Sequence, residues 1–382
     1  MRVLVEGSGG ASGWPAPGCR CASCLYQVMD GSLRKRSAIV VDEVIRLGVG
    51  GQEDQKFSGD YLVLRLADAR DPGRAGGWDV TTPDGGRLLY PAGPGAVPEP
   101  AEGAGRYDIA FLDLLGEPAQ LGLLRARGLV TADTITMVAF ADHRVPSEPE
   151  LWRRCGFWGA AVPGDEETVT TDRSDKEGLK DLAGTTRRLP WRVLVLGGAR
   201  SGKSERAELR LAGEPDVTYV ATAPAGGGGD GDPTGRAGAA DPEWAARVAA
   251  HRARRPTWWR TAETTDLAGV LASARGARGA PGALLIEGIG TWLAAVLDEC
   301  GGWGGSAEPA ARVAARVAGL VAAWRQTQAY VVAVSDEAGL GVVPATPAGR
   351  LFRDELGRLN RVLAAESEET ELVVAGRIFP LA

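Results

Sequence analysis

A glycine-rich segment near the middle of the chain has the residue types and spacing of a phosphate-binding loop. Residues 193–204 read VLVLGGARSGKS, and from position 197 they fit the pattern G-x-x-x-x-G-K-[ST] without a mismatch. Glycines let backbone N–H groups turn toward phosphate oxygens, the lysine reaches the terminal phosphates, and the serine hydroxyl can bind Mg²⁺. The apolar run before the loop predicts a strand and the segment after it a helix, as the motif requires. The predicted nucleotide contacts are Gly197, Gly198, Ala199, Arg200, Ser201, Gly202, Lys203 and Ser204.

A histidine at the end of a predicted helix is a second candidate for chemistry. Residues 241–243 read DPE, which favours a helix start, and an apolar face runs from Trp244 through Val248 to His251. His251 could simply complete that face. The arginines at 252, 254 and 255 favour a chemical role. A cationic cluster lowers the imidazole pKa, keeps the ring neutral and nucleophilic, and attracts phosphate oxygens.

Composition limits the class of protein. The 382 residues suffice for two domains, and the apolar and charged fractions, 44% and 24%, are typical of a globular protein. A net charge of −6 gives no reason to expect nucleic acid or an anionic membrane as a partner. No stretch approaches the roughly 18 apolar residues of a membrane span, and the N-terminus begins directly in a predicted strand. We therefore expect a cytoplasmic protein.

The element pattern predicts two domains joined by a linker. In the first half we expect strands at 2–7, 37–42, 61–67, 87–93, 107–115 and 135–143, with helices at 118–127 and 148–155. Residues 164–188 are polar and lack an apolar face, which is typical of a linker. The expected division is a domain at 1–165, a linker at 166–189 and a domain at 190–382.

In the second half, apolar strands alternate with helices. Strands are expected at 193–197, 216–222, 282–288, 329–337 and 371–376, and helices at 241–254, 291–299 and 308–326. Continuous apolar strands between helices indicate an α/β fold with a mostly parallel sheet covered on both faces. The glycine-rich stretch at 224–240 is interpreted as a surface insertion.

An ordered set of motifs in this half resembles one family. They are GGARSGKS, the strand ending in ATA at 221–223, ARVAAHRARRP followed by WRTAE, LLIEGIGTWL, VVAVSDEAGLGVVP and GRLFRDELGRLNRVLA. Together, over residues 192–378, they resemble the bifunctional adenosylcobinamide kinase / adenosylcobinamide-phosphate guanylyltransferases of cobalamin (vitamin B12) biosynthesis. The resemblance implies a P-loop (RecA-like) fold and an enzyme with ATP and GTP as substrates and Mg²⁺ as cofactor. It also implies a homo-oligomer, because the family forms trimers.

The resemblance implies two reactions. A γ-phosphoryl group passes to the hydroxyl of adenosylcobinamide, and GMP then passes from GTP, through a guanylylated His251, to adenosylcobinamide phosphate. Lys203 and His251 would be catalytic, and Ser204 and Glu287 would hold Mg²⁺. Glu263, after WRTA, would contact the nucleotide. The remaining implied contacts are Ala221, Thr222, Ala223, Arg252, Ala253 and Arg254. The family commonly has Thr-Asn-Glu where this chain has Ser335-Asp336-Glu337.

The first half resembles the metallo-β-lactamase fold of the phosphodiesterase type, a four-layer αββα domain. The features are GSGGASGWPAPGCRCASC and the strand after RKRS. Cys19, Cys21 and Cys24 could supply three ligands of a structural Zn²⁺, with His143 as the fourth, although they could also be three reduced thiols. The hydrolase site of the metallo-β-lactamase fold needs the cluster H-x-H-x-D-H and further histidines. This chain has two histidines in all, and neither lies in such a cluster. We therefore interpret this half as a non-catalytic domain.

Two alternatives remain open at this stage. The phosphate-binding loop alone fits a P-loop small-molecule kinase or a nucleotide-sensing protein, in which His251 is structural. A zinc-clipped binding or scaffolding protein would bind nucleotide as a regulatory ligand without turnover. The arginines beside His251 favour, over both alternatives, the two-step kinase and guanylyltransferase function that the resemblance implies.

Overall fold

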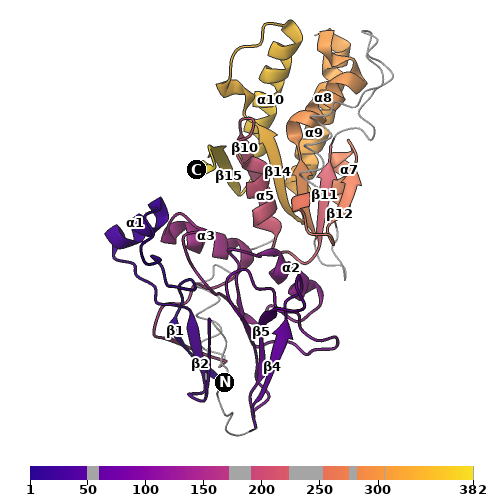
Figure 1. Cartoon of the computed structure of the whole chain (residues 1–382). Coiled ribbons are helices and arrows are strands. Elements are labelled where there is room, and N and C mark those ends of the chain that lie inside the picture. The colour runs from indigo at the N-terminus through magenta and orange to yellow at the C-terminus, as the bar shows by residue number, and fades with distance from the viewer. Residues whose placement is uncertain (50–59, 172–190, 223–252, 275–281, 305, 382) are drawn as a thin grey trace. The chain divides into compact units, whose positions relative to one another are not determined.

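The computed structural model describes residues 1–49, 60–171, 191–222, 253–274, 282–304 and 306–381 (Figure 1). The chain divides into two compact units. The first comprises Met1–Arg187 with Ala212–Pro215, and the second comprises Arg188–Leu211 with Asp216–Ala382. Within the described ranges, none of the helices combines the length and the apolar character needed to cross a lipid bilayer.

The first unit contains two sheets that share one apolar core. A four-stranded antiparallel sheet has the order β3-β2-β1-β9, and a five-stranded mixed sheet has the order β4-β5-β6-β7-β8. Alternate side chains of β1 and β2, such as Val3 and Ile39, pack with Val80 and Phe111 of the other sheet. The strands are β1 (Arg2–Gly7), β2 (Ala38–Val41), β3 (Ile45–Gly48), β4 (Leu62–Ala67), β5 (Ala75–Thr81), β6 (Arg87–Pro91), β7 (Ile109–Leu112), β8 (Ile135–Val138) and β9 (Glu167–Thr170).

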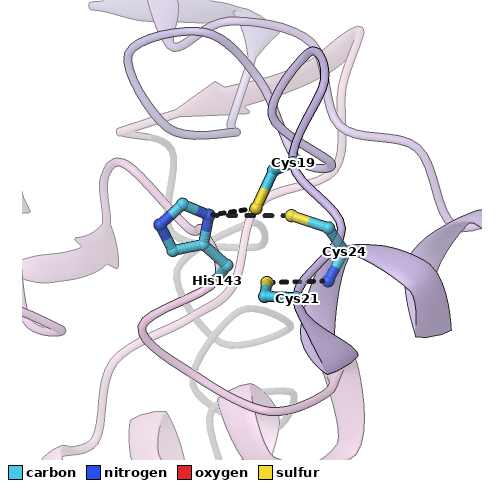
Figure 2. Close-up of side chains that lie close together, drawn as sticks. All are labelled: Cys19, Cys21, Cys24 and His143. Atoms are coloured by element: carbon cyan, nitrogen blue, oxygen red, sulfur yellow. Dashed lines mark hydrogen bonds between the residues drawn. The ribbon is translucent and has the colours of Figure 1, made fainter.

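Helices of the first unit are short and begin where the sequence supplies a start signal. They are α1 (Ala22–Asp30), α2 (Ala119–Ala126) and α3 (Glu148–Trp158). The thiol of Cys21 caps α1 by accepting from the Cys24 N–H, and a proline stands in the first turn of α3. Figure 2 shows the start of α1 beside His143. Cys21 and Cys24 therefore lie at the start of α1.

The second unit is built on a seven-stranded sheet with the order β12-β11-β13-β14-β10-β15-β16. Every pair is parallel except β15 with β16, which closes one edge as an antiparallel hairpin. Because β10 lies between β14 and β15, its side chains are buried on both faces. The strands are β10 (Trp191–Gly197), β11 (Val217–Ala221), β12 (Arg260–Glu263), β13 (Ala283–Glu287), β14 (Tyr330–Asp336), β15 (Glu369–Val374) and β16 (Arg377–Leu381).

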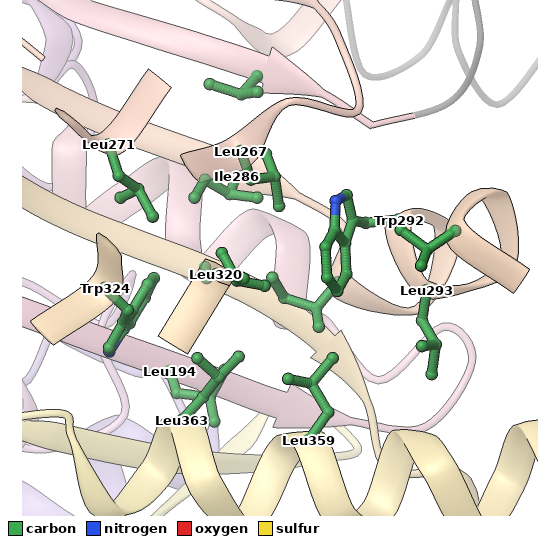
Figure 3. Packing of buried hydrophobic residues seen from close by; sticks show 14 of the residues in the cluster. Leu194, Leu267, Leu271, Ile286, Trp292, Leu293, Leu320, Trp324, Leu359 and Leu363 are labelled. Atoms are coloured by element: carbon green, nitrogen blue, oxygen red, sulfur yellow. The ribbon is translucent and has the colours of Figure 1, made fainter. Parts of the chain in front are cut away.

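Helices cover both faces of this sheet. Ala207 and Leu211 of α5 pack on one face against Val193 and Val195. On the other face, Leu359 and Leu363 of α10 point toward Leu194 (Figure 3), in a core that also holds α7, α8 and α9. The helices are α5 (Lys203–Leu211), α7 (Leu267–Ser273), α8 (Ile289–Cys300), α9 (Ala307–Gln326) and α10 (Pro347–Ala365). This confirms the predicted α/β fold with helices on both faces.

Most predicted elements are present, and the differences have local causes. The segment expected to be a linker begins with β9, where Val169 is buried and the strand pairs with β1. Thr168, Val169 and Thr170 are β-branched, and that local β preference outweighs the polar composition around them. The pattern also did not predict β3, the glycine-containing β5, the short polar edge strand β12, or β16. The predicted helix at 241–254 lies almost wholly outside the described residues.

Candidate functional site

The phosphate-binding loop of the second unit joins the end of β10 to the start of α5. Its first glycine, Gly197, touches the neighbouring strand so closely that a Cβ there would lie 2.7 Å from the Val373 carbonyl oxygen. Gly202 has a φ of +96°, a conformation that side-chain-bearing residues rarely adopt. Both glycines are therefore required by the backbone path, and they leave the loop open in front of the N-terminus of α5.

Lys203, the first residue of α5, turns its ammonium back over the loop. Its Nζ donates to the Gly198 carbonyl oxygen at 3.1 Å and lies 2.9 Å from Oδ1 of Asp336, the last residue of β14. Asp336 comes to this position because β14 pairs with β10 in a register that aligns Asp336 with Gly197. The lysine is thus placed at the mouth of the loop, as the motif predicts, and has an acidic partner there.

Ser204 meets the second predicted metal ligand. Its hydroxyl donates to Oε1 of Glu287, the last residue of β13, at 2.6 Å. The other carboxylate oxygen, Oε2, is buried and has no hydrogen-bond partner among the residues that the structure describes. Burial raises the pKa of Glu287 to about 7, against the lowering effect of the Ser204 hydrogen bond. A hydroxyl beside an incompletely satisfied buried carboxylate is a donor set that suits Mg²⁺.

Three predicted residues form one row across neighbouring strand ends. Ala221 of β11 is aligned with Glu263 of β12 on one side and with Glu287 of β13 on the other. Thr222 ties this row together, because its hydroxyl donates to the Gly288 carbonyl at 2.7 Å and accepts from the Gly288 N–H at 3.0 Å. Strand spacings of about 4.8 Å put exposed Glu263 roughly 19 Å from β10, four strands away. The row extends the site from the phosphate loop along the carboxyl edge of the sheet.

The segment around the predicted nucleophile is described only in part. Ala223, His251 and Arg252 lie outside the described residues. Arg254 Nε donates to Glu208 of α5 at 2.9 Å, and the guanidinium of Arg255 stacks 3.6 Å from the centre of the Tyr219 ring. Burial raises the pKa of Glu208 despite its pairing with Arg254. Two of the arginines that follow His251 are therefore held by contacts with α5 and β11 of the second unit.

A buried ion cluster that the sequence did not reveal anchors the loop helix. Arg206 of α5 binds both carboxylate oxygens of Glu371 on β15, at 2.9 and 2.6 Å. Arg210, one turn further along, also donates to Glu371, at 2.9 Å, and pairs with Glu369. The spacing of the two arginines, i and i+4, was a usable signal for one helix face, but their partner lies on a strand about 165 residues later.

In the first unit, the four predicted metal ligands come together. The ligand atoms of Cys19, Cys21, Cys24 and His143 all lie within 4.8 Å of one another (Figure 2). His143 Nδ1 is 3.8 Å from the Cys19 sulfur and 3.6 Å from the Cys24 sulfur. Zn–S bonds of about 2.3 Å and Zn–N bonds of about 2.0 Å in a tetrahedron separate such ligands by roughly 3.5 Å. The cluster therefore has the dimensions of a metal site.

The thiols of this cluster differ in their surroundings. Hydrogen bonding from the Cys24 backbone N–H lowers the pKa of exposed Cys21, whereas burial raises the pKa of Cys24 to about 11. A bound cation would reverse the effect of burial, because a coordinating thiol loses its proton. His143 follows β8, which ends at Val138, so the expected strand at 135–143 is shorter than predicted and the histidine lies in a turn.

The parallel sheet, the loop between β10 and α5, and the acidic strand ends define a P-loop nucleotide-binding enzyme. The family model described as "Cobinamide kinase / cobinamide phosphate guanyltransferase" matches residues 193–381. This chain also matches curated proteins of that function over nearly their whole length. It therefore belongs to the cobinamide kinase / cobinamide phosphate guanyltransferase family.

Curated relatives agree with this assignment. The bifunctional adenosylcobalamin biosynthesis protein CobU of Salmonella typhimurium is 37% identical over 190 residues, which are 48% of this chain and 96% of the relative. The CobU protein of Escherichia coli is 36% identical over 190 residues, with the same coverage. The bifunctional adenosylcobalamin biosynthesis protein CobP of Pseudomonas aeruginosa is 36% identical over 192 residues, 50% of this chain and 96% of the relative.

Proposed function

We propose that this chain phosphorylates adenosylcobinamide with ATP or GTP and then transfers GMP from GTP to the product, giving adenosylcobinamide-GDP. The observation that carries the proposal is the Ser204–Glu287 hydrogen bond of 2.6 Å at the phosphate-binding loop. It brings together, from two distant segments, the oxygen ligands that the Mg²⁺ of a nucleoside triphosphate requires. Family membership supplies the substrate class.

In the kinase step, the hydroxyl oxygen of adenosylcobinamide attacks the γ-phosphorus, and the bond to the β-phosphate oxygen breaks. The hydroxyl proton passes to water and the nucleoside diphosphate departs. The backbone N–H groups of residues 197–204 and the ammonium of Lys203 would bind the phosphates and offset their growing charge. Because Lys203 reaches the loop mouth from the first turn of α5, it needs little rearrangement to contact a terminal phosphate.

Mg²⁺ would be held by the Ser204 hydroxyl and, directly or through water, by the Glu287 carboxylate. When bound, it would neutralise phosphate charge. The fit rests on the buried Glu287 Oε2, which has no hydrogen-bond partner in the described parts of the chain. Glu263, Ala221 and Thr222 would line the rest of the nucleotide site, with Ala223, Arg252, Ala253 and Arg254 beside the nucleophile.

In the guanylyl transfer step, we propose His251 as nucleophile. A neutral ring nitrogen attacks the α-phosphorus of GTP, the bond to the β-phosphate oxygen breaks, and pyrophosphate leaves. A phosphate oxygen of adenosylcobinamide phosphate then attacks the same phosphorus, and the P–N bond breaks to restore the histidine. The contacts of Arg254 with Glu208 of α5 and of Arg255 with Tyr219 of β11 hold two cations near this segment, which supports a cationic environment for this chemistry.

For the first half, we propose a non-catalytic, metallo-β-lactamase-like αββα domain with a structural Zn²⁺. Two sheets around a shared core and a Cys₃His cluster of tetrahedral dimensions support this proposal. We propose that 1–165, with β9 added, and 190–382 are separate domains of a homo-oligomer, trimeric by family resemblance. A cytoplasmic location follows from the use of ATP and GTP.

Labelling with GTP tests the proposed function. The protein is incubated with α-labelled GTP and Mg²⁺ without corrinoid, and the intact mass and acid lability are measured. We expect a stoichiometric, acid-labile GMP adduct on His251, lost in His251→Ala, which should still bind nucleotide. Lys203→Ala should impair both activities. GTP binding without an adduct would favour a plain P-loop kinase or a nucleotide-sensing protein. An adduct retained in His251→Ala would refute the assignment of His251 as the nucleophile.

A further inference from the structure

We propose that Asp336 sets the nucleotide affinity of this enzyme by acting as an internal counter-ion of Lys203. The inference rests on the proposed function, because it concerns the site that would bind ATP or GTP. It assigns a role to a residue that the phosphate-loop motif does not contain. Asp336 would act through Lys203, and so it is a positioning residue.

The ammonium of Lys203 is already engaged within the protein. It donates to the Gly198 carbonyl oxygen at 3.1 Å, and the same nitrogen lies 2.9 Å from Asp336 Oδ1 in an ion pair. The Lys203 side chain is only 14% exposed, whereas that of Asp336 is 54% exposed. The lysine charge is therefore partly neutralised before any phosphate arrives, and the carboxylate faces the solvent from which nucleotide enters.

Asp336 is held in place by its backbone. Its carbonyl oxygen accepts from Nδ2 of Asn360 on α10 at 3.0 Å, and Asn360 Oδ1 in turn accepts from the Ser335 hydroxyl at 2.6 Å. Asn360 is buried and lies in the C-terminal part of α10. The next residue, Glu337, donates its N–H to the Gly197 carbonyl at 3.2 Å. The end of β14 is thus fixed to both the phosphate loop and α10, so the acidic partner stays beside Lys203.

A triphosphate that binds this loop must compete with Asp336 for Lys203. The phosphates carry more charge than one carboxylate and also accept hydrogen bonds from the loop N–H groups. They would therefore displace Asp336 from Lys203. Their gain is reduced by the lost Lys203–Asp336 pair and by repulsion from the carboxylate left behind. An amide at position 336 would keep the shape, weaken the contact with Lys203 that a phosphate must replace, and remove the repulsion from the carboxylate.

Asp336→Asn and Glu337→Gln form a matched pair for the test. Each removes one negative charge from adjacent positions. The Glu337 carboxylate, however, accepts from the Gly339 N–H at 3.1 Å, a bond that glutamine can keep. Equilibrium titration with a fluorescent GTP analogue, with and without Mg²⁺ and at low and high salt, gives the dissociation constants. Steady-state kinetics with GTP as phosphoryl donor then separate KM from kcat.

We expect Asp336→Asn to lower the dissociation constant roughly three- to tenfold, with the effect falling mainly on KM and shrinking at high salt. Glu337→Gln should change it by less than about twofold. Equal effects of the two variants would indicate a general charge effect, and unchanged or weaker binding by Asp336→Asn would likewise overturn the inference. If the unmodified protein binds no GTP, the proposed function itself fails.

Discussion

Ser204 and Glu287 lie 83 residues apart in the chain and share a hydrogen bond of 2.6 Å. The bond joins the first turn of α5 to the end of β13, which lies two places from β10 in the sheet. It satisfies one oxygen of a buried carboxylate and leaves the other without a partner among the described residues. The two side chains of the candidate nucleotide site are therefore already in contact, at the cost of burying an acidic group.

That cost predicts a pH-dependent stability. Burial raises the pKa of Glu287 from its model-compound value of 4.5 to about 7, so the folded protein holds this proton more tightly than the unfolded chain. The resulting stabilisation is fully present below about pH 4.5 and is lost as the pH rises through about 7. We expect Glu287→Gln, which needs no proton, to gain relative to the unmodified protein by about 2.5 kcal/mol between pH 5 and 8.

Urea unfolding of the metal-free and nucleotide-free protein at the two pH values measures this difference. Glu263→Gln is the control, since Glu263 ends a strand of the same sheet but is exposed. A wild-type and Glu287→Gln pair whose stability difference is the same at pH 5 and pH 8 would contradict the raised pKa.

The buried cluster around Glu371 predicts a second effect on stability. Glu371→Gln removes the shared carboxylate of Arg206 and Arg210, in a site where both guanidinium groups are almost fully buried, and leaves Arg210 with Glu369 as its charged partner. Removing one member of a buried ion cluster typically costs about 3–5 kcal/mol. We therefore expect a loss of that order in the free energy of unfolding, and weaker nucleotide binding, because α5 carries the loop residues Lys203 and Ser204.

Glu369→Gln separates burial from charge in this experiment. Glu369 pairs with Arg210 on the same strand, but its side chain is 36% exposed. Its variant should lose less than about 1 kcal/mol. Urea unfolding followed by tryptophan fluorescence measures both, and equal losses in the two variants would mean that burial of the Glu371 cluster is not decisive.

The cysteine cluster predicts a bound metal. Protein purified without chelator should contain about one Zn²⁺ per chain by elemental analysis, and Cys24→Ser or His143→Ala should lose most of it, because four ligands are needed to close a tetrahedral structural site. Chelation should lower the thermal stability of the unmodified protein and leave that of the variants unchanged.

Cys300→Ala is the matched control for metal content, since this buried cysteine lies outside the cluster. It should keep its Zn²⁺. Metal content that stays near zero after reconstitution with Zn²⁺ would show that the three thiols serve another purpose, and equal loss in Cys300→Ala would point to general unfolding.

The phosphate loop could be predicted from sequence because everything that specifies it is local. The strand, the glycines required at 197 and 202, the lysine and the helix all lie between Trp191 and Leu211, and backbone geometry within that span decides the shape. The grouping of three cysteines with a histidine was predictable for a different reason. With three clustered cysteines and two histidines in the chain, the choice of a fourth ligand was small, and the structure brings His143 to that position.

The sequence by itself therefore determined the family of the second half, its phosphate-loop motif and the four candidate metal ligands of the first half. Only the tertiary structure decided the partners of these residues. The order of strands places β14 and β15 on either side of β10, and this brings Asp336 to Lys203 and Glu371 to Arg206. Strand order depends on packing between segments more than one hundred residues apart, and no spacing within one segment records it.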